Sequence, residues 1–425
     1  MLNKQYTNML NEKDIIFEIF NYSQKRAMEI GAENVHNFSL GNPSVPAPEA
    51  VPAVIHEKLQ TLDPLALHGY SPSTGIPEVK EKIAADLNQQ YRNDNRHITS
   101  CNSNSNHHIT SCNNNTSSYN SKLTPYSASN LFITAGAASA LAHALRAVSN
   151  PGDEILTIAP YFPEYVPYAA GAGLKLKVVP ADTDTFQVPF DALEEMLTPS
   201  VAAVLINSPN NPSGIVYSTE TIKRLAEILT RKSEEFGQPI FLISDEPYRD
   251  IIFQGTDSPY VANFYANTIT CYSFSKSISL PGERIGYLAV NPDCEYARQI
   301  IEICPQISRT TGHNGAASLI QRTVGEVCSM TSDLSVYETN KKLLYEALTE
   351  YGYHCVEPGG TFYMFPRSLE SDSMAFCKRA MEMDLMLVPG DNFGCPGHFR
   401  IAYCVPTERV KKALPVFKRL AESYQ

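Results

Sequence analysis

The chain has 425 residues, of which 43% are hydrophobic and 19% charged, the balance of an ordinary globular protein with a large core. Its formal charge of -11 argues against a nucleic-acid partner, which would need a clustered basic surface. No apolar run approaches the roughly 18 residues of a membrane span, and the N-terminus lacks the apolar core of a signal peptide. We therefore expect a cytoplasmic protein without membrane contact. The ten cysteines contain no C-x-x-C pair, which argues against a disulfide framework and a zinc ribbon.

The first ninety residues predict two helices separated by irregular segments. Residues 14–30 place apolar side chains along one helical stripe, with Gly31 as the expected end of the helix. Three prolines between positions 38 and 48 exclude regular structure there. The turn at 68–75 opens the second helix, which we expect over 78–83.

Residues 93–121 interrupt this pattern. The segment is rich in asparagine and serine, and the hexapeptide at 97–102 occurs again at 108–113. Because so polar a composition cannot bury enough apolar surface to offset ordering, we expect a mobile, low-complexity surface loop. Its potential zinc ligands are His97, Cys101, His107, His108 and Cys112. Nothing rigid would orient these side chains, so we expect no metal site.

After residue 130 the chain alternates between short apolar strands and helical stretches. This alternation favours an α/β fold with a mostly parallel central sheet and helices on both faces. The strands are expected near 131–134, 154–158, 202–207, 240–244, 267–273 and 285–290. Ligands bind such sheets beyond the carboxyl ends of the strands, so the residues that follow each strand are candidates for a site.

A lysine between two serines, Lys276, follows the strand expected at 267–273. Its amine could form a Schiff base with a phosphate-bearing aldehyde, while the nearby hydroxyls and the guanidinium of Arg284 hold the phosphate. Gly282 and Gly286 bracket that arginine, which indicates a tight backbone path near a ligand. Taken alone, Lys276 could also be one surface lysine among many.

Three more patterns follow strands. The small-residue turn Gly136, Ala137 and Ala138 opens a helix, whose first free amides can bind an anion. Asp245 comes directly after a fully apolar strand, where an unpaired charge would be costly, although an isolated aspartate is also a common helix cap. The string at 207–214 is rich in Asn, Pro and Gly, as a simple turn would be.

The run from Ser273 to Tyr287 resembles the cofactor-lysine signature of the pyridoxal phosphate-dependent aminotransferases, class I/II, of fold type I (the aspartate aminotransferase superfamily). The string at 207–214 resembles the N-P-x-N-P-T-G of this family, with serine in place of threonine. The resemblance implies a large cofactor-binding domain, as described above, plus a smaller α/β domain built from both chain ends. The expected divisions are 1–45 for an N-terminal segment of the small domain, 46–295 for the large domain and 296–425 for the small C-terminal domain.

The resemblance also assigns residues to pyridoxal 5'-phosphate. Lys276 would form the Schiff base, Asp245 would keep the ring nitrogen protonated, and Phe162 would stack on the ring. Tyr248 and Asn211 would bind the phenolic oxygen. The phosphate would be held by Gly136, Ala137, Ala138, Ser273, Ser275, Arg284 and, from the neighbouring subunit of a homodimer, Tyr70. Without the resemblance, Phe162 would be interpreted as an ordinary core residue, and Tyr70 would be interpreted as a buried tyrosine in a turn.

For the substrate, the resemblance implies three residues. Arg400 would grip the α-carboxylate with a two-pronged ion pair, Asn211 would touch the same group, and Gly41 would present its backbone. An arginine that enters a strand, as Arg400 does, could instead lie on the surface.

The implied activity is transamination between an L-amino acid and a 2-oxo acid, with aspartate and 2-oxoglutarate as the first expectation. Two alternatives stay open. One is β-elimination by a carbon-sulfur lyase, because the same residues serve both reactions. The other is a non-catalytic, aminotransferase-like ligand sensor attached to a DNA-binding module, for which the roughly 36 residues ahead of the motifs leave little room.

Overall fold

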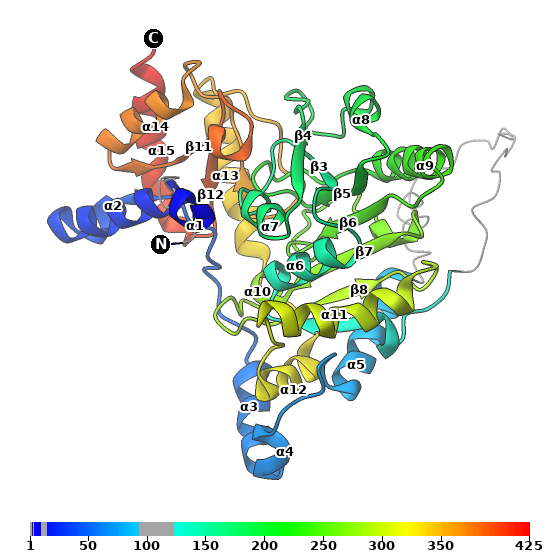
Figure 1. The fold of residues 1–425 in the computed structure, drawn as a ribbon. Coiled ribbons are helices and arrows are strands. Elements are labelled where there is room, and N and C mark those ends of the chain that lie inside the picture. Colours follow the sequence, from blue (N-terminus) through cyan, green and yellow to red (C-terminus); the bar gives the residue numbers. More distant parts are fainter. Residues whose placement is uncertain (1, 3, 10–14, 93–122) are drawn as a thin grey trace, which may run out of the picture.

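The structure is a computed structural model that describes residues 2, 4–9, 15–92 and 123–425. Figure 1 shows a large domain around a seven-stranded sheet and, beside it, a smaller domain that contains the C-terminus. The insertion expected at 93–121 lies outside the described residues, as do its potential zinc ligands.

The central sheet has the strand order β2-β8-β7-β6-β5-β3-β4. Its strands are β2 (Leu131–Thr134), β3 (Glu154–Ile158), β4 (Lys175–Val179), β5 (Val201–Asn207), β6 (Phe241–Asp245), β7 (Thr268–Ser273) and β8 (Gly286–Val290). Only β8 is antiparallel to its neighbours, β2 and β7. The other six strands run the same way, so their carboxyl ends meet at one edge of the sheet.

Helices surround this sheet. They are α3 (Ala50–Thr61), α4 (Pro64–His68), α5 (Pro77–Leu87), α6 (Ala137–Ala147), α7 (Tyr165–Gly171), α8 (Phe190–Met196), α9 (Thr219–Phe236), α10 (Phe274–Ser277), α11 (Ala297–Thr311) and α12 (Ser318–Val327). Shorter helical turns are found at Asn88–Arg92, Ala128–Asn130 and Val261–Asn263.

Both faces of the sheet are covered, as the continuous apolar runs of its strands predict. In β5, Ala203 and Leu205 belong to a core with α6, α7 and α11, whereas Val204 and Ile206 belong to a core with α9. Successive side chains of a strand point to opposite faces, so one apolar strand serves both layers. The two layers hold the strand ends rigidly, which is what a site at those ends requires.

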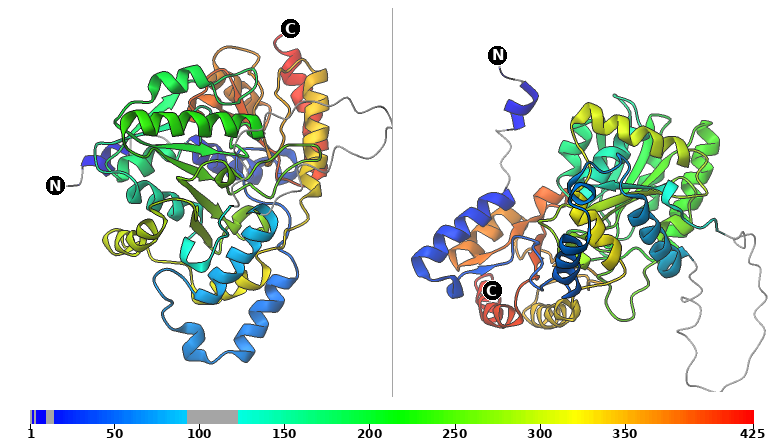
Figure 2. Two further views of the ribbon diagram at one scale, coloured as in Figure 1. Left: turned by 90° about the vertical axis from the view of Figure 1, so that its right-hand side faces the viewer. Right: turned by 90° about the horizontal axis from the view of Figure 1, so that it is seen from below.

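The small domain combines segments from both chain ends. Its elements are α2 (Ile15–Ile30), Ala32–Asn34, β1 (His36–Asn37), α13 (Ser335–Glu350), β9 (Tyr363–Met364), α14 (Ser373–Glu382), β10 (Leu385–Met386), β11 (Val388–Pro389), Gly390–Phe393, β12 (Phe399–Ala402) and α15 (Thr407–Glu422). The short helix α1 (Lys4–Met9) lies nearest the N-terminus. β1 pairs in parallel with β10, and β11, β12 and β9 form an antiparallel sheet. Figure 2 shows α2, in blue, along the orange and red segments of the C-terminal part; there Ile19 packs with Met386 and Val388.

Two helices lie on the other side of the expected domain boundary. Ile300 of α11 belongs to a core with α6, and Val324 and Val327 of α12 belong to a core with α3 and α5. Both helices follow residue 295, where the sequence analysis ends the large domain. We propose that the boundary lies between α12 and α13 instead, because the apolar side chains up to Val327 are buried by the large domain.

Six of the seven sheet strands lie where the sequence predicts them. The seventh, β4, is an edge strand in which Lys175 and Lys177 are exposed, so it lacks the apolar run that marks the others. The described residues include no helix long and apolar enough to cross a membrane and no cluster of three potential metal ligands. The cytoplasmic location stays a prediction.

Candidate active site

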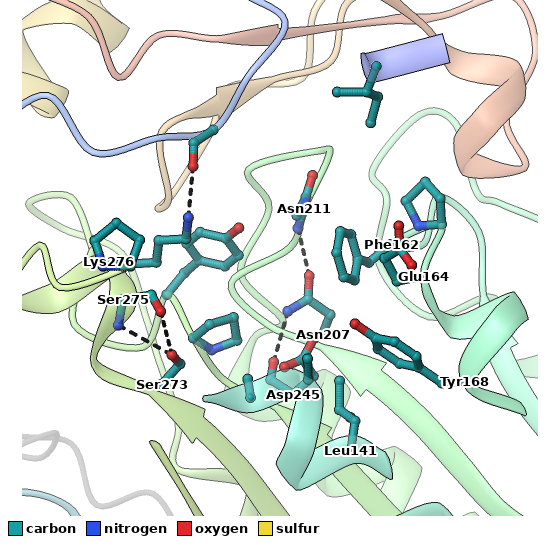
Figure 3. A pocket seen from close by; sticks show the side chains of 18 of the residues that line it. Leu141, Phe162, Glu164, Tyr168, Asn207, Asn211, Asp245, Ser273, Ser275 and Lys276 are labelled. Atoms are coloured by element: carbon teal, nitrogen blue, oxygen red, sulfur yellow. Dashed lines mark hydrogen bonds between the residues drawn. The ribbon is translucent and has the colours of Figure 1, made fainter. Parts of the chain in front are cut away.

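A pocket of about 620 Å³ lies between the two domains, beyond the carboxyl ends of the sheet strands. Figure 3 shows Lys276, Asp245 and Asn211 around the same space. The predicted site residues that line it are Gly41, Ala137, Ala138, Phe162, Asn211, Asp245, Tyr248, Ser273, Ser275, Lys276, Arg284 and Arg400. Thus segments that are up to 359 positions apart in the sequence, Gly41 and Arg400, meet at one cavity.

One end of the pocket is suited to an anion. Gly136 precedes α6 with a φ of 85°, and a Cβ there would lie 2.6 Å from Nη2 of Arg284, so glycine is needed for the turn and the guanidinium to meet. The first amides of α6 have no acceptor within the helix. Arg284 donates to Ser275 Oγ at 3.4 Å, and that hydroxyl lies 2.7 Å from Ser273 Oγ. Amides, hydroxyls and a guanidinium together form a phosphate-binding set.

Lys276 lies in α10, directly after β7. Its Nζ donates to the carbonyl oxygen of Gly41 at 2.7 Å, across the two domains. Burial lowers the pKa of Lys276 to about 8; the nearby Cys404 opposes this shift, and the positive charges of Arg284 and Arg400 add to it. Part of the amine is therefore neutral near neutral pH, and the neutral amine is the nucleophilic form.

Asp245 ends β6 and is 3% exposed. The Tyr165 hydroxyl donates to its Oδ2 at 2.6 Å, whereas its buried Oδ1 accepts no hydrogen bond from the described residues. Among the residues that the structure describes, no backbone amide donates to the carboxylate, so the helix-cap alternative is wrong. Burial raises the pKa of Asp245 to about 7; the Tyr165 hydrogen bond opposes this shift, and the negative charge of Glu246 adds to it. A buried carboxylate oxygen without a donor is suited to a protonated ring nitrogen.

The loop after β5 connects Asp245 to Arg400 through two asparagines. Asn207 Nδ2 donates to the main-chain oxygen of Asp245 at 2.8 Å, and Asn207 Oδ1 accepts from the amide of Asn211 at 2.7 Å. Asn211 Oδ1 in turn accepts from Arg400 Nη1 at 3.0 Å. Since an amide side chain has both donors and acceptors, Asn211 keeps its Nδ2 for a ligand.

Arg400 is 3% exposed, so the surface alternative is wrong. Its Nη2 donates to Ser39 O at 2.6 Å, but its Nε is buried without an acceptor among the described residues. Its Cζ lies 4.8 Å from the ring centroids of both Tyr363 and Phe393. Burial lowers the pKa of Arg400, and the Tyr363 phenol opposes this shift. A buried guanidinium with a spare donor suits a carboxylate ligand.

Aromatic side chains complete the wall. Phe162 follows β3 and stands edge-on to Tyr165, with ring centroids 5.8 Å apart. The hydroxyls of Tyr248 and Tyr363 lie 3.1 Å apart. The sequence analysis assigned no role to Tyr165, Tyr363 or Asn207. A tyrosine close to a strand is usually a core residue, and only a hydrogen bond to a site residue distinguishes Tyr165 and Tyr363 from such residues. For Asn207 the sequence did hold a signal, because it lies in the same 207–214 string as Asn211.

Tyr70 lies away from this pocket. It is fully exposed in the turn between α4 and α5, so the alternative of a buried turn tyrosine is wrong. Its predicted contact with the phosphate of a neighbouring subunit concerns a second chain and stays a prediction.

The fold and the pocket have counterparts among known proteins. The family model described as aminotransferase class I and II matches residues 33–417, so the chain belongs to this family. The aspartate aminotransferase of Thermotoga maritima is 27% identical over 400 residues, covering 92% of this chain and 93% of its own. The aspartate/prephenate aminotransferase of Thermus thermophilus is 26% identical over 405 residues, covering 93% and 94%. A crystal structure of an amino transferase from Eubacterium rectale is 43% identical, with a TM-score of 0.90 and complete coverage of both chains.

These similarities confirm three predictions: the family, the α/β fold with a mostly parallel sheet, and an aminotransferase that depends on pyridoxal 5'-phosphate. The residues of the pocket fit this cofactor. Asp245 offers an unpartnered buried oxygen, and Gly136 leaves space beside Arg284 that any side chain would fill. Lys276 also lines the pocket, with a partly neutral amine.

Proposed function

We propose that the chain moves an amino group between an L-amino acid and a 2-oxo acid in the pocket between its two domains. One observation carries this proposal: three groups that are costly to bury alone line the same cavity. They are the Lys276 amine, the unpartnered Asp245 oxygen and the Arg400 guanidinium. A pyridoxal 5'-phosphate molecule and the carboxylate of an amino acid supply partners for all three.

The large domain would hold the cofactor. Lys276 would bind it covalently through Nζ, Asp245 would pair with its ring nitrogen, and Phe162 would cover one face of the ring. Tyr248 and Asn211 would donate to its phenolic oxygen. Bound pyridoxal 5'-phosphate supplies an electron-withdrawing ring, which makes the α-proton of the amino acid removable. At the other end, the phosphate would lie between the α6 amides and Arg284.

Lys276 is also the group that would move the proton. With a pKa of about 8, the free Lys276 amine can be neutral. In that form Nζ can accept the α-proton of the donor amino acid. The same nitrogen would pass that proton to the bound cofactor, and in the opposite half-reaction it would carry a proton from the cofactor to the carbon that was the carbonyl carbon of the 2-oxo acid. The hydrogen bond to Gly41 orients Nζ toward the small-domain side of the pocket, where the substrate would bind.

The small domain would hold the substrate. Arg400 would bind the α-carboxylate through its spare donors, with Asn211 beside it and Gly41 closing the wall. Aspartate as donor and 2-oxoglutarate as acceptor are the proposed pair. This choice is supported by the names of the Thermotoga maritima and Thermus thermophilus relatives.

The proposed active unit is a homodimer with shared sites. Tyr70 of each subunit would reach the phosphate end of the pocket in the other. Its complete exposure supports this role, because a large aromatic side chain in a turn is usually buried unless a partner covers it.

The test is a panel of amino donors with 2-oxoglutarate, using the purified chain reconstituted with pyridoxal 5'-phosphate. Aspartate should give glutamate at the highest kcat/KM, and aspartate alone should bleach the visible absorbance of the cofactor. Absence of amino transfer from every donor would contradict the proposal. Release of pyruvate and sulfide from cysteine without an acceptor would favour β-elimination.

A further inference from the structure

Tyr363 is a second phenol in the centre of the pocket, and none of the roles above includes it. It is 2% exposed and lines the cavity. Its hydroxyl lies 3.1 Å from that of Tyr248, and its ring faces the guanidinium of Arg400. A Cβ on Gly41 would lie 1.8 Å from the Tyr363 hydroxyl oxygen. The phenol therefore packs against the same residue whose carbonyl accepts the hydrogen bond from Lys276.

The backbone holds this side chain firmly. Tyr363 begins β9 and pairs with Ala402 of β12, the strand that carries Arg400. Two residues earlier, Thr361 has a φ of 62°, a left-handed conformation that is costly for a β-branched residue. Thr361 Oγ1 accepts a hydrogen bond from the backbone amide of Tyr363 at 3.0 Å, and the backbone amide of Thr361 donates to the carbonyl oxygen of Ile251 at 2.9 Å. A strained turn held by these bonds fixes where the phenol points.

The direction of the hydrogen bond between the two phenols matters. A phenol has one proton to donate, so Tyr248 cannot serve both Tyr363 and a ligand. If Tyr363 is the donor, the Tyr248 proton stays available to the pocket. Burial raises the pKa of Tyr363 to about 12 and that of Tyr248 well above its ordinary range, so both phenols keep their protons at neutral pH.

Charged and titratable groups also face this pair. Arg400 lowers the pKa of both phenols, whereas Asp245 raises that of Tyr248 and Cys404 raises that of Tyr363. The pKa values of both phenols nevertheless stay above neutral pH, so both keep the protons that the hydrogen bond between them needs.

We propose that Tyr363 is a positioning residue for transamination: its hydroxyl donates to Tyr248 and so directs the Tyr248 proton toward the phenolic oxygen of the cofactor, while its ring supports Arg400. This inference rests on the proposed function. Linked hydrogen bonds polarise one another, so a Tyr248 that accepts from Tyr363 is a stronger donor. Tyr363 would thus couple the substrate side of the pocket to the cofactor side.

The first test is Tyr363→Phe in the cofactor-loaded enzyme. This variant keeps the ring beside Arg400 and removes only the hydroxyl. The pH midpoint of the visible cofactor absorbance should rise by about 0.5 to 1 unit, because the negative phenolic oxygen loses stabilisation. The value of kcat should fall about three- to tenfold, and the KM for the amino donor should change less than about twofold. Tyr363→Leu, which also removes the ring, should raise that KM about tenfold.

A double-mutant comparison separates positioning from a merely structural role. In a Tyr248→Phe background, Tyr363→Phe should leave the absorbance midpoint unchanged, because the proton that it directs is already absent. Tyr353→Phe is the matched control: it removes a buried small-domain phenol that donates to Phe417 O at 3.0 Å, and it should behave as the wild type.

Two results would overturn the inference: a wild-type midpoint in Tyr363→Phe, or the same shift in both backgrounds. Either outcome differs from failure of the proposed function. If the wild-type chain showed neither a cofactor absorbance nor amino transfer, the function itself would be wrong. If it showed both and Tyr363→Phe matched it, only the role of Tyr363 would be wrong.

Discussion

The two walls of the pocket are built in different ways. In the large domain, Asp245 ends β6 and Lys276 lies three residues beyond the neighbouring parallel strand β7, so the regular sheet fixes their separation. In the small domain, Gly41, Tyr363 and Arg400 come from three separate segments that meet only when both chain ends fold together. The first wall carries the groups suited to a cofactor, and the second carries those suited to a carboxylate substrate.

The large-domain wall would therefore carry the reaction with the cofactor, and the small-domain wall would mainly bind the substrate. Three hydrogen bonds join the walls: from Lys276 to Gly41, from Arg400 to Asn211, and between the hydroxyls of Tyr248 and Tyr363. Loss of the Lys276 amine in the large-domain wall should therefore abolish the reaction, whereas loss of the Arg400 guanidinium in the small-domain wall should mainly weaken substrate binding. Tyr363, whose hydroxyl contacts Tyr248 across the pocket, is the exception, because loss of that hydroxyl should mainly lower kcat. Variants on each side test whether the division holds.

The largest effect is expected for Lys276→Ala. Without the amine there is neither a covalent attachment nor a group to move the proton, so kcat should fall by about a thousandfold or more. The visible cofactor absorbance should also be lost. Both are measured by spectra and steady-state rates with aspartate and 2-oxoglutarate. A fully active variant would place the chemistry on another residue.

Arg400→Leu should come next, with kcat/KM lowered about a hundredfold and most of the loss in KM. The cofactor absorbance should remain, because this residue belongs to the substrate wall. Arg379→Leu, which removes an exposed arginine of α14, is the control and should leave both parameters unchanged. Unchanged substrate binding in Arg400→Leu would mean that another cation holds the carboxylate.

Gly41→Ala should have a smaller effect. The added methyl would lie 1.8 Å from the Tyr363 hydroxyl oxygen, so that ring must move and kcat/KM should fall about tenfold. Gly171→Ala is the matched control, because a Cβ there meets nothing closer than 3.6 Å. If both variants kept wild-type kinetics, the tight contact between Gly41 and Tyr363 would not matter for recognition.

The smallest effect concerns the stability of the cofactor-free protein. The pKa of Asp245 is raised from 3.8 to about 7 by burial, so the folded state binds its proton more tightly than the unfolded state. This group favours folding below about pH 4, and the benefit is lost as the pH rises through 7. Between pH 5 and pH 8 the free energy of unfolding should fall by on the order of 2 kcal/mol relative to Asp245→Asn.

Urea unfolding of both cofactor-free proteins at the two pH values measures this difference. An equal pH dependence in the wild type and the variant would show that the Asp245 carboxyl is not desolvated. Binding of a cationic ring beside the carboxylate should reduce the difference, because the charged form of Asp245 then has a partner.

The sequence predicted the side chains at strand ends better than the side chains that contact the site through distant partners, for a physical reason. Asp245 comes at the end of the apolar run 240–244 and Lys276 just past the strand expected at 267–273, so their place at the sheet edge follows from the fold class. Tyr363 and Tyr165 act only through partners that are far away in the sequence, Tyr248 and Asp245. No local pattern distinguishes such a tyrosine from a core residue.

The same reasoning explains where the fold differs from the prediction. The sequence analysis did not predict β4, because alternate exposed lysines replace the apolar run of a central strand. We propose a boundary later than residue 295; the sequence does not indicate it, because α11 and α12 are amphipathic helices and amphipathicity does not reveal which domain covers the apolar face. Tertiary packing decides both whether an edge strand such as β4 forms and which domain covers a helix such as α11 or α12.

The covalent role of Lys276 is the central claim, and reductive trapping tests it most directly. The chain is loaded with pyridoxal 5'-phosphate, reduced with borohydride and digested, and the modified peptide is identified by mass spectrometry. The account predicts a stable pyridoxyl adduct on the peptide that contains Lys276, and none in Lys276→Ala. An adduct on a different lysine, or no adduct in the wild-type chain, would contradict it.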